Sequence, residues 1–122
     1  MRTPLSLFAL VGVISTAFSS SAMATPVTNL DLSGKEFCWN DGGTENYYPG
    51  GKYSSTHDGH GTWAITDKGV EISTNQISGL ADMQRLPDGT FTATWLVDGK
   101  PKTWVGHYLR AGDPCRVSRK MR

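Results

Sequence analysis

The chain has 122 residues, with 12 Lys or Arg against 11 Asp or Glu, and its formal net charge is +1. This length suits a single domain with one hydrophobic core. The nearly neutral balance argues against a dedicated nucleic-acid-binding protein, because such proteins usually carry a basic surface across the whole domain.

The first 24 residues have the pattern of a cleavable signal peptide. Arg2 supplies the positive charge, residues 5–18 are uncharged and mostly apolar, and Ala22-Met23-Ala24 places small residues where a signal peptidase cleaves. The apolar run is shorter than the roughly 20 residues that a membrane-spanning helix needs. We therefore predict a mature protein that begins at Thr25, has no membrane span, and is periplasmic or secreted.

The remaining residues, 25–122, are predicted to form one β domain with a basic C-terminal tail. Without the leader, 11 basic residues face 11 acidic ones. Four of the basic residues follow Cys115, so residues 25–115 hold only seven. We expect the tail to be a solvated terminus, because terminal residues are usually loosely held. These four residues are Arg116, Arg119, Lys120 and Arg122.

Short runs of β-branched and aromatic residues alternate with turns along the rest of the chain, and no stretch has a helical period. Asp-Gly and Gly-Gly pairs in the turns supply the positive φ angles of tight hairpins. Consecutive hairpins predict an antiparallel meander of seven or eight short strands, closed or nearly closed into a β-barrel because closure removes the two edges. The predicted strands are 35–40, 45–48, 52–55, 61–66, 70–74, the second half of 77–86, 90–97 and 102–110. Residues 25–34, with Leu30 and Leu32, are expected to pack over one end of the barrel.

Two cysteines follow the leader, Cys38 in the first predicted strand and Cys115 just after the last. An even number of cysteines in an exported chain predicts a disulfide. The first and last strands of an up-and-down barrel are neighbours, so a Cys38–Cys115 bond is possible in a closed barrel but not in an open meander of this length. The pair therefore supports closure.

The segment His57-Asp58-Gly59-His60 is a candidate metal site. Two imidazoles three positions apart in a hairpin loop could bind a divalent metal, with Asp58 or His107 as a third ligand. An exposed polar hairpin tip explains the same residues, and we expect no metal or other cofactor. A metal-dependent enzyme that uses His57 and His60 remains an alternative.

Aromatic residues are numerous for so small a domain. Phe91 and Trp95 share a strand face and are expected in the core, whereas the adjacent Tyr47 and Tyr48 must point to opposite sides. We expect side chains to fill a barrel of this size, with an aromatic barrel mouth for a small apolar or sugar-like ligand as the alternative. The aromatic set is Trp39, Tyr47, Tyr48, Tyr53, Trp63, Trp95, Trp104 and Tyr108.

No nucleophile motif is present, and both cysteines are assigned to the predicted disulfide. Asp41 and Glu45 could act as an acid and a base, but a charged turn explains them equally well. The absence of a catalytic motif favours a protein that is not an enzyme.

Gly51-Lys52-Tyr53, followed by Trp63 and by Lys68-Gly69, loosely resembles the tyrosine, tryptophan and lysine-glycine elements of small periplasmic lysozyme inhibitors. The resemblance covers about a fifth of the chain, and the four residues between Trp63 and Lys68 depart from the family's spacing. It implies a compact exported β domain that works by inserting a loop into the cleft of an enzyme.

We predict an exported binding protein whose hairpin loops contact a protein partner, with inhibition of a cell-wall-degrading or toxic enzyme as one such role. A small-ligand-binding barrel of the calycin type is the alternative. No nucleic-acid partner is expected, and the sequence leaves the oligomeric state open. The predicted binding residues are Tyr47, Tyr48, Tyr53, His57, Asp58, His60 and Trp63.

Overall fold

The computed structural model describes residues 23–117. The predicted signal peptide up to residue 22, and residues 118–122 of the basic tail, lie outside this range. The described residues form the helix α2 (Asn29–Leu32) and the strands β2 (Thr25–Pro26), β3 (Lys35–Trp39), β4 (Thr44–Tyr47), β5 (Lys52–Ser55), β6 (Gly59–Thr66), β7 (Gly69–Thr74), β8 (Ser78–Arg85), β9 (Phe91–Val97) and β10 (Lys100–Tyr108). This part of the chain contains no helix with the length and apolar character needed to cross a bilayer.

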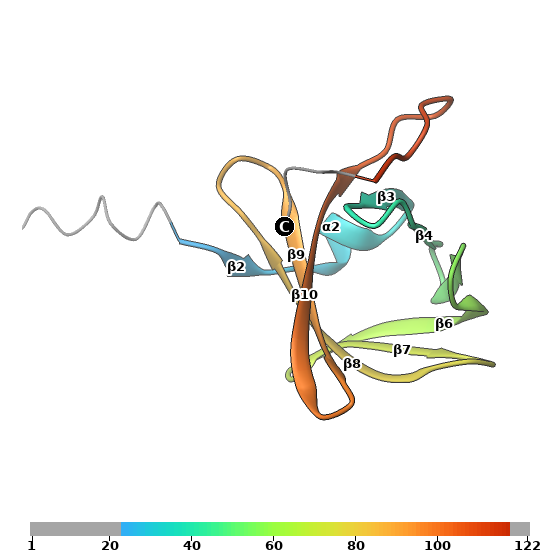
Figure 1. Cartoon of the computed structure of the whole chain (residues 1–122), viewed down its shortest axis with the longest axis vertical. Helices are drawn as coiled ribbons and strands as arrows, with labels where there is room; N and C mark the ends of the chain where they lie inside the picture. Colours follow the sequence, from blue (N-terminus) through green and yellow to red (C-terminus); the bar gives the residue numbers. More distant parts are fainter. Residues whose placement is uncertain (1–22, 118–122) are drawn as a thin grey trace, which may run out of the picture.

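Strands β3 to β10 form an eight-stranded antiparallel closed barrel, as the sequence predicts (Figure 1). Each strand pairs with the next along the chain, and β10 pairs with β3 to close the ring. The closing seam is short, because only Gly106, His107 and Tyr108 of β10 face β3. The other end of β10 continues with β9 as a hairpin that extends past the seam, visible in orange at the bottom of Figure 1.

Alternation along each strand separates the core from the surface. In β3, Phe37 and Trp39 point inward, and in β9 Phe91 and Ala93 do the same. The inward residues form one continuous hydrophobic cluster with Val27 and Leu32 from the lead-in. The largest fully buried side chains of this cluster are Tyr47, Tyr53, Phe37, Phe91, Leu32, Ile72 and Val70.

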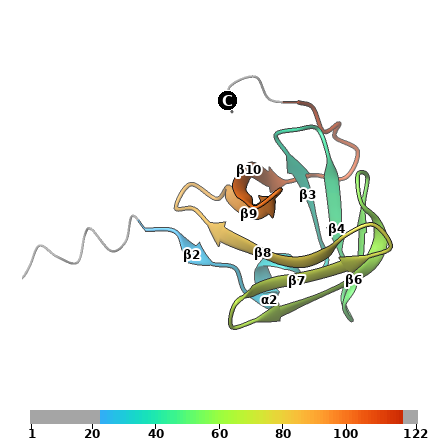
Figure 2. The same cartoon turned by 60° about the horizontal axis from the view of Figure 1, so that its bottom comes forward.

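Helix α2 covers one end of the barrel, as expected for residues 25–34, although no helix was predicted there (Figure 2). Leu32 is 0% exposed and plugs this end, whereas Leu30 points away from it and is 87% exposed. Asp31 holds the helix in place, because its carbonyl accepts a hydrogen bond from Tyr108 Oη at 2.7 Å and its carboxylate pairs with Arg85 at 3.0 Å. Four residues are too few to show a helical period, which explains why the sequence pattern missed α2.

Three strands differ from the prediction by two residues or more at an end, and one of them, β10, spans Lys100–Tyr108 rather than 102–110. β6 begins at Gly59 rather than at residue 61, because Gly59 adopts φ +87° and pairs directly with Ser55. β8 spans Ser78–Arg85, so most of the irregular segment 77–86 is a strand rather than its second half alone. These differences lie at strand ends, where boundaries depend on how far the pairing with the neighbouring strand continues.

The predicted disulfide is present between Cys38 and Cys115, whose Cα atoms are 5.4 Å apart. Cys38 alternates with the inward Phe37 and Trp39, so its side chain lies on the outside of β3, yet it is 3% exposed. The segment after β10 therefore covers it. This segment also forms an isolated β-bridge between Val117 and Asp41. A disulfide of this kind is typical of proteins that fold in oxidising compartments.

Removing the disulfide should strongly destabilise the barrel. The two cysteines are 77 positions apart, and the chain-entropy argument gives a bond that closes so long a loop about 4–5 kcal/mol. We expect the Cys38→Ser/Cys115→Ser double variant to lose free energy of unfolding of that order, measured by urea denaturation. Reductant should lower the stability of the wild type and leave the double variant unchanged. Equal stability of the two proteins without reductant would contradict this prediction.

Candidate functional site

The barrel interior is not filled throughout, in contrast to the expectation from strand number. A cavity of about 690 Å³ opens at the end opposite α2, and we call it the cup. Its lining residues come from β3, β4, β5, β8, β9 and β10 and from the loops next to them. Its lining residues are Trp39, Asp41, Gly43, Thr44, Glu45, Ser55, His57, Asp58, Gln76, Ile77, Ser78, Ala93, Trp95, Leu96, Val97, Asp98 and Trp104.

Three tryptophans form the wall of the cup. Trp39 comes from β3, while Trp95 and Trp104 come from the extended β9–β10 hairpin. Gly106 makes room for the Trp39 ring, since a Cβ atom at position 106 would lie 2.5 Å from Trp39 Cε3. Gly79 makes room for the Trp95 ring in the same way, since a Cβ atom at position 79 would lie 3.0 Å from Trp95 Cζ3. Glycine at these two positions therefore lets flat rings lie against the backbone of neighbouring strands.

Glu45 brings a carboxylate into the cup from β4. Its position follows from alternation, because it shares the inward face of β4 with Tyr47 and pairs with Phe37 and Ser55 on either side. Three neutral donors meet this carboxylate. Its Oε1 accepts hydrogen bonds from Trp39 Nε1 at 2.9 Å and from Tyr47 Oη at 2.6 Å. Its Oε2 accepts one from Tyr53 Oη at 2.7 Å.

The charge state of this cluster depends on burial. Burial raises the pKa of Glu45 above its usual value, and the three hydrogen bonds oppose the shift while the nearby charge of Asp58 adds to it. Burial, and then the Glu45 carboxylate, also hold the pKa values of Tyr47 and Tyr53 well above the usual range of a phenol. Both tyrosines therefore stay protonated and remain donors to Glu45 across the physiological range.

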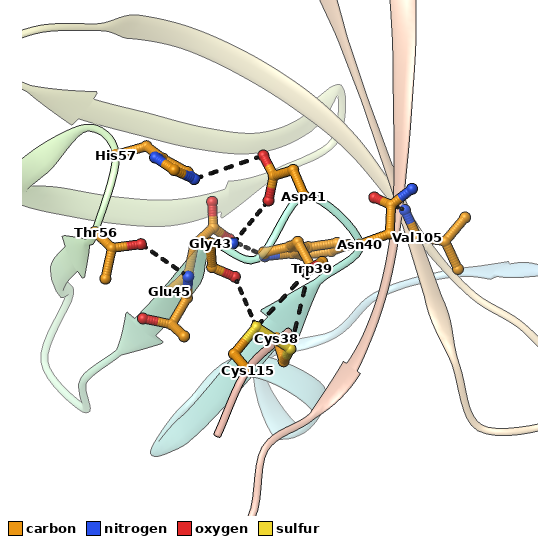
Figure 3. Close-up of a disulfide and its surroundings, with 11 residues drawn as sticks. Cys38, Trp39, Asn40, Asp41, Gly43, Glu45, Thr56, His57, Val105 and Cys115 are labelled. Atoms are coloured by element: carbon orange, nitrogen blue, oxygen red, sulfur yellow. Dashed lines mark hydrogen bonds and ion pairs between the residues drawn. A yellow bond between two sulfur atoms is a disulfide. The ribbon is translucent and has the colours of Figure 1, made fainter. Parts of the chain in front are cut away.

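The rim of the cup is held by the disulfide (Figure 3). Gly43 donates its N–H to Asp41 Oδ1 at 2.8 Å, and its carbonyl oxygen lies 3.4 Å from Cys115 Sγ. Since a disulfide sulfur carries no hydrogen, the second distance is a packing contact. His57 Nε2 reaches Asp41 Oδ2 at 3.7 Å, and its ring lies so close over Gly43 that a Cβ atom there would be 2.4 Å away. The loop that presents Asp41 is therefore fixed by residues far apart in sequence.

The charged residues that line the cup are mostly acidic. Asp41, Glu45, Asp58 and Asp98 contribute four carboxylates, and His57 is the one basic side chain among the lining residues. The Lys102 ammonium lies 5.2 Å from the centroid of the Trp104 ring, but Lys102 is not itself a lining residue. The cup thus combines aromatic walls with a negative interior.

The predicted binding residues divide into three groups. Tyr47, Tyr53 and Trp63 are 1%, 2% and 6% exposed and belong to the core, so they support the cup from below. Tyr48 directly follows β4 and is exposed, as alternation with Tyr47 predicts. The remaining three residues belong to the hairpin that the sequence assigned to a protein partner.

Of these three, His57 and Asp58 line the cup, whereas His60 lies on the outer side of the barrel beside Tyr48 and Lys52. The structure therefore does not bring His57 and His60 together. His107 lies on the outer face of β10, opposite Cys38. In the range 23–117 there is no group of three or more His, Cys, Asp or Glu side chains that could hold a metal ion. Contact of this hairpin with a protein partner stays a prediction.

Sequence reasoning kept an aromatic barrel mouth as its alternative, but it missed the roles of two residues of the cup, Glu45 and Trp95. Glu45 was weighed only as one half of an acid and base pair with Asp41, and Trp95 was expected in the core. Trp95 does share an inward face with Phe91, but it lies farther along β9, where the barrel opens. An inward-facing acidic residue between Thr44 and Tyr47 was the available signal for Glu45, because such a residue on the core face of a strand is rarely structural.

No protein-family model matches the chain, and neither the search of curated proteins nor the search of solved structures found a match.

The stability of the protein should report the unusual environment of Glu45. Below its ordinary pKa of 4.5 the carboxyl group is neutral in both the folded and the unfolded chain. Above that pH the unfolded chain ionises first, because the folded site has the higher pKa, so ionisation favours unfolding. We expect the free energy of unfolding of the wild type, relative to Glu45→Gln, to fall as the pH rises above 4.5, measured by urea denaturation at several pH values.

Glu71→Gln is the matched control, because Glu71 is exposed on the outer face of β7. Its stability relative to the wild type should show no such fall with rising pH. A Glu45→Gln variant that loses stability relative to the wild type as the pH rises would show that the hydrogen bonds outweigh burial, contrary to the prediction.

Proposed function

We propose that this chain is a ligand-binding barrel that holds a small molecule in the cup. The observation that carries the proposal is an open cavity of about 690 Å³ lined by three tryptophans and by the half-buried carboxylate of Glu45. Small-molecule sites in proteins commonly have volumes of roughly 300–1,000 Å³, mostly apolar walls and a few converging polar groups. The mouths of β-barrels are among the places where such sites occur.

The arrangement beneath the cup also supports a preformed site. Trp39, Tyr47 and Tyr53 donate to Glu45 and are themselves packed in the core, so the carboxylate is held in one position. Rigid polar groups in a binding site reduce the entropy lost on binding. A purely structural core would more often place an apolar side chain at position 45.

We place this function in the periplasm or outside the cell. The disulfide fits an oxidising compartment, and the first 24 residues have the pattern of a signal peptide. A carrier, a scavenger or a sensor of a small molecule would suit this location. The protein-partner role stays open for the hairpin that contains His57 and His60, since these side chains are exposed.

Filling the cup should abolish binding. We expect a fragment library with cationic, neutral and anionic members to contain compounds that bind saturably to the wild type, detected by tryptophan fluorescence. Three of the chain's four tryptophans line the cup, so the signal is intrinsic. Ala93 is a buried lining residue of the cup. The Ala93→Phe side chain should occupy part of the cup and weaken the binding of the same compounds at least tenfold.

Ala64→Phe is the matched control, because Ala64 lies on the outer face of β6 beside the inward Trp63. It should leave binding unchanged. Thermal unfolding of both variants separates lost binding from lost structure, since an overpacked residue costs about 1–3 kcal/mol. If no compound binds, or if binding survives in folded Ala93→Phe, the proposal is wrong.

A further inference from the structure

We propose that the ligand of the cup is a small organic cation, an amine or quaternary ammonium joined to a compact apolar or aromatic body. This inference rests on the proposed function and adds the chemical class of the ligand. It follows from the charges of the lining residues, from the incomplete pairing of Glu45 and from the arrangement of the tryptophans.

The first argument is the sign of the charge in the cup. Four carboxylates line it, with His57 as the one basic lining residue. Low-dielectric walls concentrate the field of such groups, which attracts a positive ligand and repels a negative one. Sites for carboxylates or phosphates instead contain Arg or Lys in bidentate or point-charge contact, and neither residue type lines the cup.

The second argument is that Glu45 has no cationic partner among residues 23–117. Its three hydrogen bonds come from neutral groups, and the two ion pairs of this part of the chain are His57–Asp41 and Arg85–Asp31. Glu45 is half-buried, and carboxylates that are withdrawn from water are ordinarily paired with a positive charge. A ligand cation would supply that charge.

The geometry of the Glu45 hydrogen bonds leaves room for this contact. Oε1 already accepts two hydrogen bonds, from Trp39 and Tyr47. Oε2 accepts one, from Tyr53, and a carboxylate oxygen has the capacity for two. An ammonium N–H in the cup could therefore donate to Oε2 without displacing a tyrosine, and a quaternary ammonium would interact with the same oxygen through its charge alone.

The third argument is the aromatic wall. Cations bind favourably to the face of tryptophan, the best of the aromatic side chains for this contact. The protein already shows the contact at one ring, where the Lys102 ammonium lies 5.2 Å from the centroid of Trp104. Trp39 connects the aromatic wall with the carboxylate, because its ring lines the cup and its Nε1 donates a hydrogen bond to Glu45. Apolar lining from Ile77 and Ala93 would accommodate the body of the ligand.

The test compares three probes of similar size: benzyltrimethylammonium, the neutral N,N-dimethyl-2-phenylacetamide and the anionic phenylacetate. We expect saturable binding of the cation to the wild type, at least tenfold tighter than the neutral probe, with no detectable binding of the anion. Isothermal titration calorimetry and tryptophan fluorescence both report the affinity. Calcium and zinc ions serve as metal probes and should cause neither a thermal shift nor competition.

Variants connect the preference to the cup. Glu45→Gln and, separately, Asp58→Asn should each lower the affinity for the cation at least fivefold and leave the affinity for the neutral probe unchanged. Asp82→Asn is the matched control, because Asp82 is an exposed acid on the outer face of β8 and lies outside the cup. It should change neither affinity, and it corrects for the loss of one negative charge from the whole protein.

The outcomes separate this inference from the proposed function. If the neutral or the anionic probe binds as tightly as the cation, and Ala93→Phe abolishes that binding, the cup binds ligands but the cation assignment is wrong. If calcium or zinc binds and displaces the organic cation, the carboxylates form a metal site instead and the inference also fails. If nothing binds in the cup, the proposed function itself fails.

Discussion

The pairing of β10 with β3 is the constraint on which the rest of the molecule depends. Only three residues of each strand face one another at this seam, yet they turn a meander with two free edges into a closed barrel. The same seam carries the Cys38–Cys115 bond on its outer side and the Trp39 ring on its inner side. Closure, the covalent link and one wall residue of the cup therefore converge within a few residues of β3.

The two ends of the barrel differ because the chain supplies different residues to them. At one end, α2 adds Leu32 to the core cluster that also contains Phe37 and Phe91, and the Asp31–Arg85 pair holds the helix in position. At the other end, no segment comparable to α2 closes the cup among the described residues, and Glu45 and three tryptophans line it beside aliphatic side chains such as Ile77 and Ala93. Alternation along the strands places the strand side chains among them on the inner face of the barrel. Their position along each strand, nearer to α2 or nearer to the opposite end, decides whether they fill the core or line the cup.

This distinction also explains how far the sequence could predict the molecule. Strands and turns were accessible because period-two patterns and Asp-Gly pairs are local signals, and closure followed from two cysteines at the ends of the meander. The role of Glu45 was not accessible, because its three donors come from β3, β4 and β5 and meet only after the register is set. The face of Trp95 was predicted correctly, but its depth depends on where neighbouring strands end. Helix α2 is shorter than the window in which a helical period is recognisable.

Because α2 closes one end of the barrel, a ligand of the cup would enter and leave through the opposite end. Leu32 and the packed side chains around it close one end of the barrel, so the cup is a pocket and not a channel through the barrel. One bound ligand would then have to dissociate before another could bind. Leu96 and Val97, near the tip of the β9–β10 hairpin, are exposed lining residues of the cup, so their side chains would be among the first that an entering ligand meets.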